Sequence, residues 1–212
     1  MNRETWSARL HEEAAYWDHV MATKGGDYPE DFRARLDPNT ELQPEIRALL
    51  PGRARILDVG AGPFTIIGKR WPGRQVFIKA IDPLAVVYSG QLARHGIMPP
   101  VWTEMGEGER LAGEYERDSF DLAYSRNALD HSHDPVTAIR GMLHVAPIVL
   151  LSHAVREATT QQHQGLHQWD FFVEEHRFLV EGGGVVTDIG AATGAHLKID
   201  TDGRWLTVTL RR

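Results

Sequence analysis

Five short apolar runs alternate with segments of helical periodicity through the middle of the chain. The runs have the length and composition of buried strands and cover Arg55–Val59, Gln75–Ile81, Val101–Met105, Phe120–Ser125 and Pro147–Ser152. Apolar residues recur at helical spacing between them, over Thr65–Trp71, Leu84–His95 and Pro135–His144. Strands that alternate with helices favour a parallel sheet covered on both faces and joined by right-handed crossovers. The pattern therefore predicts a doubly wound α/β fold.

The pattern changes after Ala154. Trp169–Val180 is typical of a strand pair that turns near Glu174-Glu175-His176, and Leu197–Leu210 is typical of a hairpin around Thr201-Asp202-Gly203-Arg204. Antiparallel strands often complete an otherwise parallel sheet. We therefore expect a mainly parallel sheet with antiparallel C-terminal strands.

The N-terminal part of the chain predicts an amphipathic helix over residues 4–22. Its apolar stripe consists of Trp6, Leu10, Ala14, Trp17 and Met21. The polar, glycine-containing segment Lys24–Pro29 ends the pattern. We expect a helical extension over residues 1–45 and a core over residues 46–212, together one domain. Three roles stay open for the extension: packing against the core, a lid hinged near Lys24-Gly25-Gly26, and contact with a partner.

Composition and charge narrow the classes of function. The 212 residues include 23 Lys and Arg against 29 Asp and Glu, which gives a net charge of −6 without a basic cluster. Nucleic acid is therefore an unfavourable partner. The absence of cysteine excludes disulfides, thiolate catalysis and cysteine-bound zinc. Without a signal core or an apolar run of membrane length, we expect a cytoplasmic monomer or homodimer that has no membrane partner.

A glycine turn at the end of the first predicted strand indicates a nucleotide-like ligand. Gly60 and Gly62 follow Asp58 directly, and glycine lets a ligand approach the backbone closely. Asp82 ends the next predicted strand, where a carboxylate can accept hydrogen bonds from two ribose hydroxyls. A dinucleotide site would carry a third glycine at the position of Thr65. Its absence favours an adenosine-bearing cofactor without a diphosphate.

Four segments, in order along residues 50–155, resemble motifs of the class I S-adenosylmethionine-dependent methyltransferases. They are Ile56–Gly62, Ala80–Leu84, Gly106–Leu111 and Phe120–His131. The resemblance implies a Rossmann-like fold, S-adenosylmethionine as cofactor and S-adenosylhomocysteine as product. It also implies cofactor contacts from Asp58, Gly60, Ala61, Gly62, Pro63, Phe64, Asp82, Pro83, Leu84, Gly106, Glu107, Gly108, Arg126 and Asn127.

Within that set, the resemblance gives three acids separate roles. Asp82 binds the ribose, and it is also well placed to cap a helix before Pro83. Glu107 reaches the adenine amine, where the family more often has aspartate. Asp58 orders the glycine turn and meets the methionine amino group through water.

Methyl transfer to an oxygen or nitrogen of a small-molecule acceptor is the activity that follows. The displacement is in line, so that the protein mainly aligns and desolvates the reactants, and a hydroxyl acceptor calls for a general base. Histidine titrates in the right range, and His131 and His153 are the candidate catalytic residues. The candidate acceptor contacts are Tyr16, Tyr28, His133, His167 and Trp169. Each histidine also has a structural alternative, such as a bond to a backbone carbonyl.

A metal site and two other functions complete the alternatives. His163 and His167 have ligand-compatible spacing, which Asp130 or Asp170 could complete. Metal-dependent methyltransferases usually have carboxylate-rich sites, and we therefore expect no metal. A non-catalytic S-adenosylmethionine-binding or scaffold subunit is the main functional alternative, and a nicotinamide-dependent oxidoreductase is disfavoured by the missing glycine.

Overall fold

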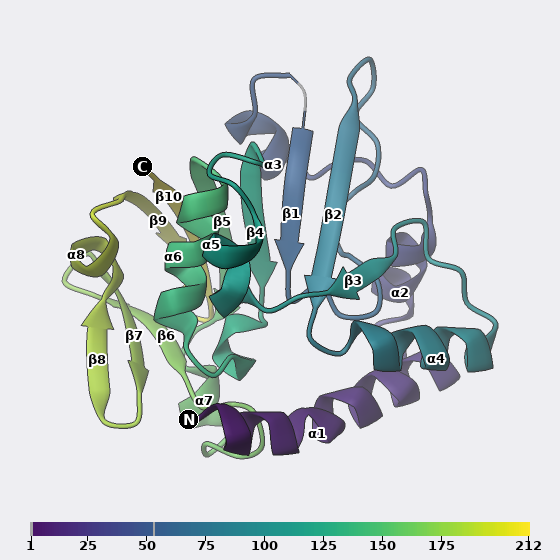
Figure 1. Ribbon diagram of the computed structural model, residues 1–212, viewed down its shortest axis with the longest axis horizontal. Coiled ribbons are helices and arrows are strands. Elements are labelled where there is room, and N and C mark those ends of the chain that lie inside the picture. The colour runs from purple at the N-terminus through teal and green to yellow at the C-terminus, as the bar shows by residue number, and fades with distance from the viewer. Residues whose placement is uncertain (1, 53) are drawn as a thin grey trace.

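The computed structural model describes residues 2–52 and 54–212 and is built on a seven-stranded sheet (Figure 1). The strand order is β3-β2-β1-β4-β5-β10-β9. The bounds are β1 Ala54–Val59, β2 Val76–Asp82, β3 Thr103–Met105, β4 Leu122–Arg126, β5 Ile148–Ala154, β9 His196–Thr201 and β10 Trp205–Arg211. The first five strands pair in parallel, and β10 runs antiparallel to both of its neighbours. The predicted parallel sheet and its antiparallel C-terminal hairpin are confirmed.

Both faces of the sheet are covered, because its central strands are apolar on both sides. Leu57 and Val59 of β1 face a cluster that includes α6, whereas Ile56 packs with Leu42 and Ile46 on the other face. The helices are α1 Arg3–Ala22, α2 Pro29–Leu36, α3 Pro44–Leu49, α4 Ala85–His95, α5 Leu111–Glu114, α6 Pro135–Val145, α7 Glu157–Thr160 and α8 Ile189–Thr193. None of them in the described residues is long and apolar enough to cross a membrane.

The predicted helix over Thr65–Trp71 is wrong. This stretch is irregular, and its backbone bonds to the N-terminal extension instead: Leu42 N–H donates to Arg70 O over 2.7 Å, and Lys69 N–H donates to Thr40 O over 2.7 Å. Gly68 makes the pairing possible, because a Cβ there would lie 1.8 Å from Glu41 O. Long-range pairing has replaced the local helix that the apolar spacing favoured.

A second, three-stranded antiparallel sheet is inserted between β5 and β9. It contains β6 Asp170–Glu174, β7 Arg177–Gly182 and β8 Val185–Asp188. The strand pair with its turn at Glu175-His176 is as predicted. The third strand was missed because it is short and its valines, Val185 and Val186, are exposed. The insert lies at one end of the molecule, beyond α6 (Figure 1).

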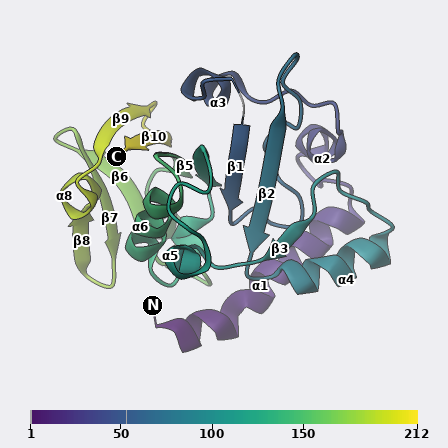
Figure 2. The ribbon, with the colours of Figure 1, turned by 45° about the horizontal axis from the view of Figure 1, so that its top comes forward.

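Helix α1, the predicted N-terminal helix, crosses the carboxyl ends of β1 and β2 (Figures 1 and 2). It is held against α4 by polar contacts at its middle and end. Gln91 Nε2 donates to Ala14 O over 2.8 Å. Asp18 Oδ1 lies 2.8 Å from Arg94 Nη2 and 2.8 Å from His95 Nε2. Because parallel sheets bind ligands at this edge, α1 closes the face where a site is expected.

Candidate functional site

A cavity of about 570 Å³ lies between the carboxyl ends of the strands and α1. One part of its wall consists of the predicted strand-end residues, namely Asp58, Gly60, Ala61, Gly62, Asp82, Pro83, Leu84, Gly106, Glu107, Gly108, Arg126 and Asn127. The other part comes from α1 and from segments near His131, Glu157 and His167. We call these two parts the strand-end wall and the histidine wall.

The turn after β1 has a backbone that only glycine adopts without strain. Gly60 and Gly62 have φ values of 71° and 65°. A Cβ at Gly60 would lie 2.5 Å from Ala128 Cβ, and one at Gly62 would lie 2.9 Å from the ring of Trp17. The turn therefore brings bare backbone to the cavity, directly under α1.

Asp82 and Asp58 are buried carboxyl groups on the strand-end wall. Asp82 accepts hydrogen bonds from Gly62 N–H over 3.0 Å and from Leu84 N–H over 2.9 Å. Burial nevertheless raises the pKa of Asp82 to about 7. Burial also raises the pKa of Asp58 to about 6, against the hydrogen bond that Thr65 donates to it. A ligand that donates hydrogen bonds to these carboxylates would stabilise their charged forms.

Glu107 follows β3 on the same wall and holds an unused acceptor. Arg3 of α1 donates to its Oε1 over 2.6 Å, whereas Oε2 is buried without a hydrogen-bond partner among the described residues. Gly106 and Gly108 flank it, and a Cβ at either would lie 3.0 Å from Ile81 or Ala138, respectively. His133 Nε2 lies 3.9 Å from Glu107 Oε2, beyond hydrogen-bond distance, and a buried carboxylate oxygen without a hydrogen bond is costly unless a ligand donates to it.

Two of the residues predicted to contact a cofactor are not among the described residues that line the cavity. Pro63 and Phe64 are buried behind the turn. Phe64 packs edge-on against Trp17 and Phe32, with ring centroids 5.5 Å apart in both pairs. This ring therefore supports the turn from beneath and connects it to α1 and α2.

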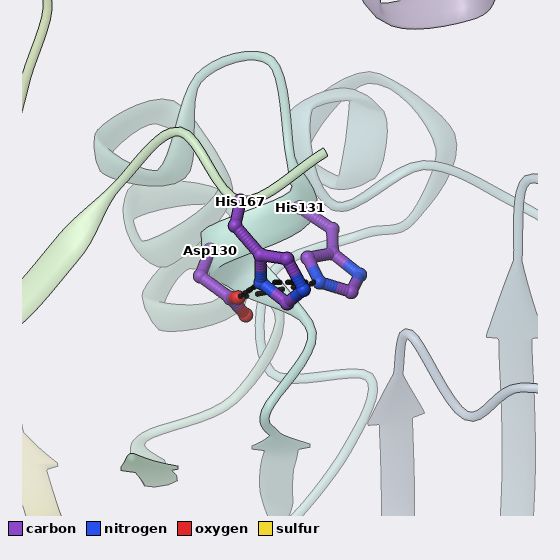
Figure 3. Close-up of side chains that lie close together, drawn as sticks. All are labelled: Asp130, His131 and His167. Atoms are coloured by element: carbon purple, nitrogen blue, oxygen red, sulfur yellow. Dashed lines mark hydrogen bonds and ion pairs between the residues drawn. The ribbon is translucent and has the colours of Figure 1, made fainter. Parts of the chain in front are cut away.

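Three side chains meet on the histidine wall, on and beyond the 3-10 turn at Leu129–His131 (Figure 3). His167 Nδ1 lies 2.9 Å from Asp130 Oδ2 and 3.0 Å from His131 Nε2. The remaining edge, from His131 Nε2 to Asp130 Oδ2, measures 3.3 Å. His131 and His167 face the cavity, and Asp130 is buried behind them.

Charge pairing outweighs burial at Asp130 and His131 of this cluster. Burial disfavours the imidazolium of His131, but Asp130 and Glu13 outweigh it and raise the pKa of His131 to about 9. Burial would likewise raise the pKa of Asp130, and the surrounding histidines instead lower it. Glu13 belongs to α1, and its Oε2 lies 3.4 Å from His131 Nδ1. The helix is thus linked electrostatically to the cluster.

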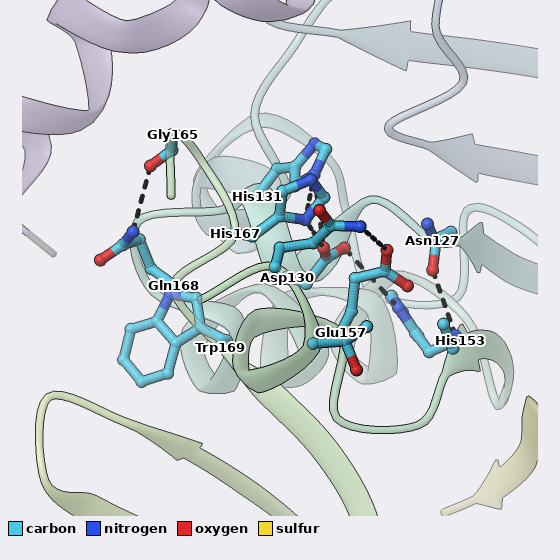
Figure 4. Close-up of polar contacts among 12 residues, drawn as sticks. Asn127, Asp130, His131, His153, Glu157, Gly165, His167, Gln168 and Trp169 are labelled. Atoms are coloured by element: carbon cyan, nitrogen blue, oxygen red, sulfur yellow. Dashed lines mark hydrogen bonds and ion pairs between the residues drawn. The ribbon is translucent and has the colours of Figure 1, made fainter. Parts of the chain in front are cut away.

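His153, the second candidate catalytic residue, lies behind Asp130 (Figure 4). Its Nδ1 is 3.9 Å from Asp130 Oδ1, and its ring stacks on Phe171 with centroids 4.3 Å apart. Neither ring nitrogen has a hydrogen-bond partner among the described residues, and burial lowers the pKa of His153 to about 4. His153 is not among the described residues of the cavity wall.

The predicted acceptor contacts divide into two groups. Tyr16, Tyr28 and His167 line the cavity, the two tyrosines as exposed side chains. His133 packs edge-on against Trp6 instead, with ring centroids 5.2 Å apart. The indole of Trp169 donates to Ser132 O over 2.8 Å and points away from the histidine pair (Figure 4). His133 and Trp169 are absent from the described cavity lining.

The described residues contain two groups of three side chains with metal-ligating atoms close together. One is Asp130, His131 and His167, and the other is Glu107, Glu109 and His133. His163, which the sequence spacing paired with His167, is exposed and belongs to neither. The four-residue spacing does not bring His163 and His167 together as metal ligands, because both lie in a loop rather than on one face of a helix.

Several lining residues were not predicted, including Trp6, Leu10 and Glu13 of α1. Trp17 donates to Glu13 Oε1 over 2.8 Å, and Trp6 donates to His131 O over 2.7 Å. A signal was present: Glu13 shares one helix face with the apolar stripe, an unusual place for an acid. Arg35, Glu157 and Gln161, which also line the cavity, carry no such signal.

Comparisons with known proteins identify the fold. No family model and no curated protein matches the sequence. The structure of a putative methyltransferase from Bacillus halodurans aligns at 12% identity over 79% of this chain and 96% of its own, with a TM-score of 0.51. The carbon methyltransferase CurJ aligns at 15% identity over 78% of this chain and 50% of its own, also at 0.51. An S-adenosylmethionine-dependent methyltransferase of Mesorhizobium loti aligns at 19% identity over 80% and 96%, with a TM-score of 0.47. At such identities a likeness shows the fold, and this chain has the Rossmann-like fold of the first two methyltransferases.

Proposed function

We propose that the protein is a methyltransferase that transfers the methyl group of S-adenosylmethionine to an oxygen or nitrogen of a small-molecule acceptor. The observation that carries the proposal is the convergence of the glycine turn, Asp82 and Glu107 on one cavity. These groups come from three successive strand ends, in the order that the sequence resemblance implies. The shared fold agrees with this activity.

The strand-end wall fits the cofactor by its chemistry. Asp82 offers free lone pairs to ribose hydroxyls beside its two backbone bonds, and the orphan Oε2 of Glu107 would accept from the adenine amine. The bare backbone of Gly60 and Gly62 leaves room beside them. When bound, S-adenosylmethionine supplies an electrophilic methyl group and leaves as S-adenosylhomocysteine.

The histidine wall would hold the acceptor. His131 is the candidate catalytic residue that reaches the cavity, and we assign to it the contact with the reacting group. His153 could act only through Asp130, because it lies behind that carboxylate, and we assign to it a positioning role. Trp6, Leu10 and Trp17 of α1 cover the cavity, and such cover excludes water from the transfer.

Isothermal titration with S-adenosylmethionine, S-adenosylhomocysteine and NAD tests the cofactor assignment directly. We expect the first two to bind and NAD not to bind. Turnover is then followed as release of S-adenosylhomocysteine over a panel of small hydroxyl, carboxyl and amine acceptors. Absence of binding to both sulfur compounds at millimolar concentration would refute the proposal. Tight binding without any turnover would favour the non-catalytic subunit.

A further inference from the structure

We propose that Asp130, His131 and His167 form a binding site for one divalent transition-metal ion on the histidine wall. The donor atoms form a compact triangle with edges of 2.9, 3.0 and 3.3 Å (Figure 3). Neighbouring ligands lie about 3.0 Å apart around an octahedral ion with bonds of about 2.1 Å, and about 3.4 Å apart around a tetrahedral one. All three edges fall within or close to that range.

Protons alone do not satisfy this triangle. Each of the three atoms presents either a proton or a lone pair to the other two, and Asp130 Oδ2 can only accept. If both histidine nitrogens donate to Asp130, two N–H groups face each other over 3.0 Å. If either nitrogen instead presents a lone pair, it faces a lone pair of Asp130, over 2.9 Å for His167 or 3.3 Å for His131. A cation between the three atoms accepts from all of them at once.

The side chains around the triangle are of the kind that orient the ligands of a metal ion. Metal-bound histidines usually donate their other ring N–H to a carboxylate, and Glu13 offers one 3.4 Å from His131 Nδ1. Behind the triangle, Asp130 Oδ1 and both nitrogens of His153 are buried without hydrogen-bond partners among the described residues. These groups are only 1% exposed, and the separation of Asp130 Oδ1 from His153 Nδ1 is 3.9 Å. A metal ion bound by Asp130 would orient Asp130 Oδ1 and His153, whose lack of hydrogen bonds is otherwise unexplained.

The site would be open on the cavity side. His131 and His167 line the cavity while Asp130 lies behind them, so further coordination positions would face the space for the acceptor. Two imidazoles with one carboxylate suit zinc, iron(II), cobalt or nickel better than magnesium or calcium. If the proposed methyl transfer holds, on which this last step rests, the acceptor would bring an oxygen that binds the ion, and His131 would then act on the reacting group through the ion rather than by direct contact.

Titration of the chelator-treated 212-residue chain with Zn²⁺ by calorimetry, and with Co²⁺ by visible absorption, tests the site. We expect one ion per chain, a Co²⁺ spectrum that reports nitrogen ligation, and much weaker binding of Mg²⁺. His167→Ala should weaken Zn²⁺ binding by more than about 10-fold, since even the loss of a group that only hydrogen-bonds a metal ligand costs about 10–100-fold. His163→Ala is the matched control, because it removes an exposed histidine of the same loop and should leave binding unchanged.

Three results would overturn the proposal: no Zn²⁺ or Co²⁺ binding, equal loss in His163→Ala and His167→Ala, or loss in Glu109→Gln with retention in His167→Ala. The last result would assign the ion to the other acidic group. Asp130→Asn provides a second variant, and His167→Ala alone carries the test if the buried substitution prevents folding. S-adenosylhomocysteine binding is measured on the same samples. If the wild-type protein does not bind S-adenosylhomocysteine, the proposed function is contradicted. The metal titration tests the metal site independently of that result.

Discussion

The two walls of the cavity are built in different ways. The strand-end wall uses backbone and carboxyl groups that come directly after β1, β2 and β3, so that each position follows from the sheet order. The histidine wall gathers side chains from α1, the turn after β4, α7 and the loop before β6. The first wall is a property of the fold, whereas the second depends on segments particular to this chain. Binding of the cofactor and treatment of the acceptor should therefore separate on mutation.

The largest expected effect is on turnover at the histidine wall. His131→Ala should lower turnover by about 100-fold or more, because positioned acid–base groups contribute about 10²–10⁴-fold. The affinity for S-adenosylhomocysteine should stay within about 2-fold of the wild type, since His131 lies on the other wall. Steady-state assays and calorimetry measure the two quantities. His196→Ala, an exposed change on β9, is the control. Equal loss of both quantities would contradict the separation of the walls.

Asp82→Ala should give the opposite result. It removes an acceptor of charge-assisted hydrogen bonds worth about 1.5–3 kcal/mol each, so that cofactor affinity should fall by about 100-fold. It also leaves Gly62 N–H and Leu84 N–H without their acceptor. Calorimetry with S-adenosylhomocysteine checks this, and Asp200→Ala on exposed β9 is the control. Unchanged affinity would remove Asp82 from the cofactor site.

The positions that make up the strand-end wall follow from the sequence, whereas their role as cofactor contacts stays a prediction. Asp58, Gly60, Asp82 and Glu107 all line the cavity, because a parallel sheet brings successive strand ends to one edge. The burial of the two aspartates and the missing hydrogen-bond partner of Glu107 Oε2 could not be predicted, since these depend on how tightly α1 packs.

The histidine wall was predicted less well, for physical reasons. His131 and His167 are 36 positions apart, and their contact depends on how the inserted segment between β5 and β9 folds back. His133, two positions beyond His131, lies past the end of the 3-10 turn and contacts Trp6 and Glu109 instead. The missing helix over Thr65–Trp71 has the same kind of cause, namely a long-range pairing with residues 40–42.

The Gly62→Ala substitution, on the strand-end wall, should also disturb α1, which contributes to the histidine wall. A Cβ at this position would both strain a φ of 65° and meet the ring of Trp17 at 2.9 Å. We expect a loss of about 10-fold in cofactor affinity and a destabilisation of about 1–2 kcal/mol, of which about 1 kcal/mol is backbone strain. Thermal unfolding and calorimetry measure both.

Gly73→Ala is the matched control for that change. Gly73 has a φ of 72°, but none of the described residues other than its chain neighbours comes within 4 Å of the added Cβ, so this variant should show the backbone strain without the loss of cofactor affinity. Trp17→Ala combined with Gly62→Ala should recover part of the affinity if contact with α1 is the cause. The same affinity loss in both glycine variants would show that α1 plays no part.

The smallest expected effect is the pH dependence of cofactor affinity. Burial raises the pKa of Asp82 to about 7, so that a growing share of the free protein carries a neutral carboxyl as the pH falls from 8 to 6. Ribose hydroxyls donate best to the charged form, and binding must then first remove the proton. Affinity for S-adenosylhomocysteine should therefore rise with pH across this window, by up to about 10-fold. Asp82→Asn should bind more weakly and lose most of this dependence. Asp58, whose pKa is raised to about 6, would shift the dependence to lower pH if it were the group responsible. A dependence that persists in Asp82→Asn with a midpoint near 6 would therefore transfer the role to Asp58.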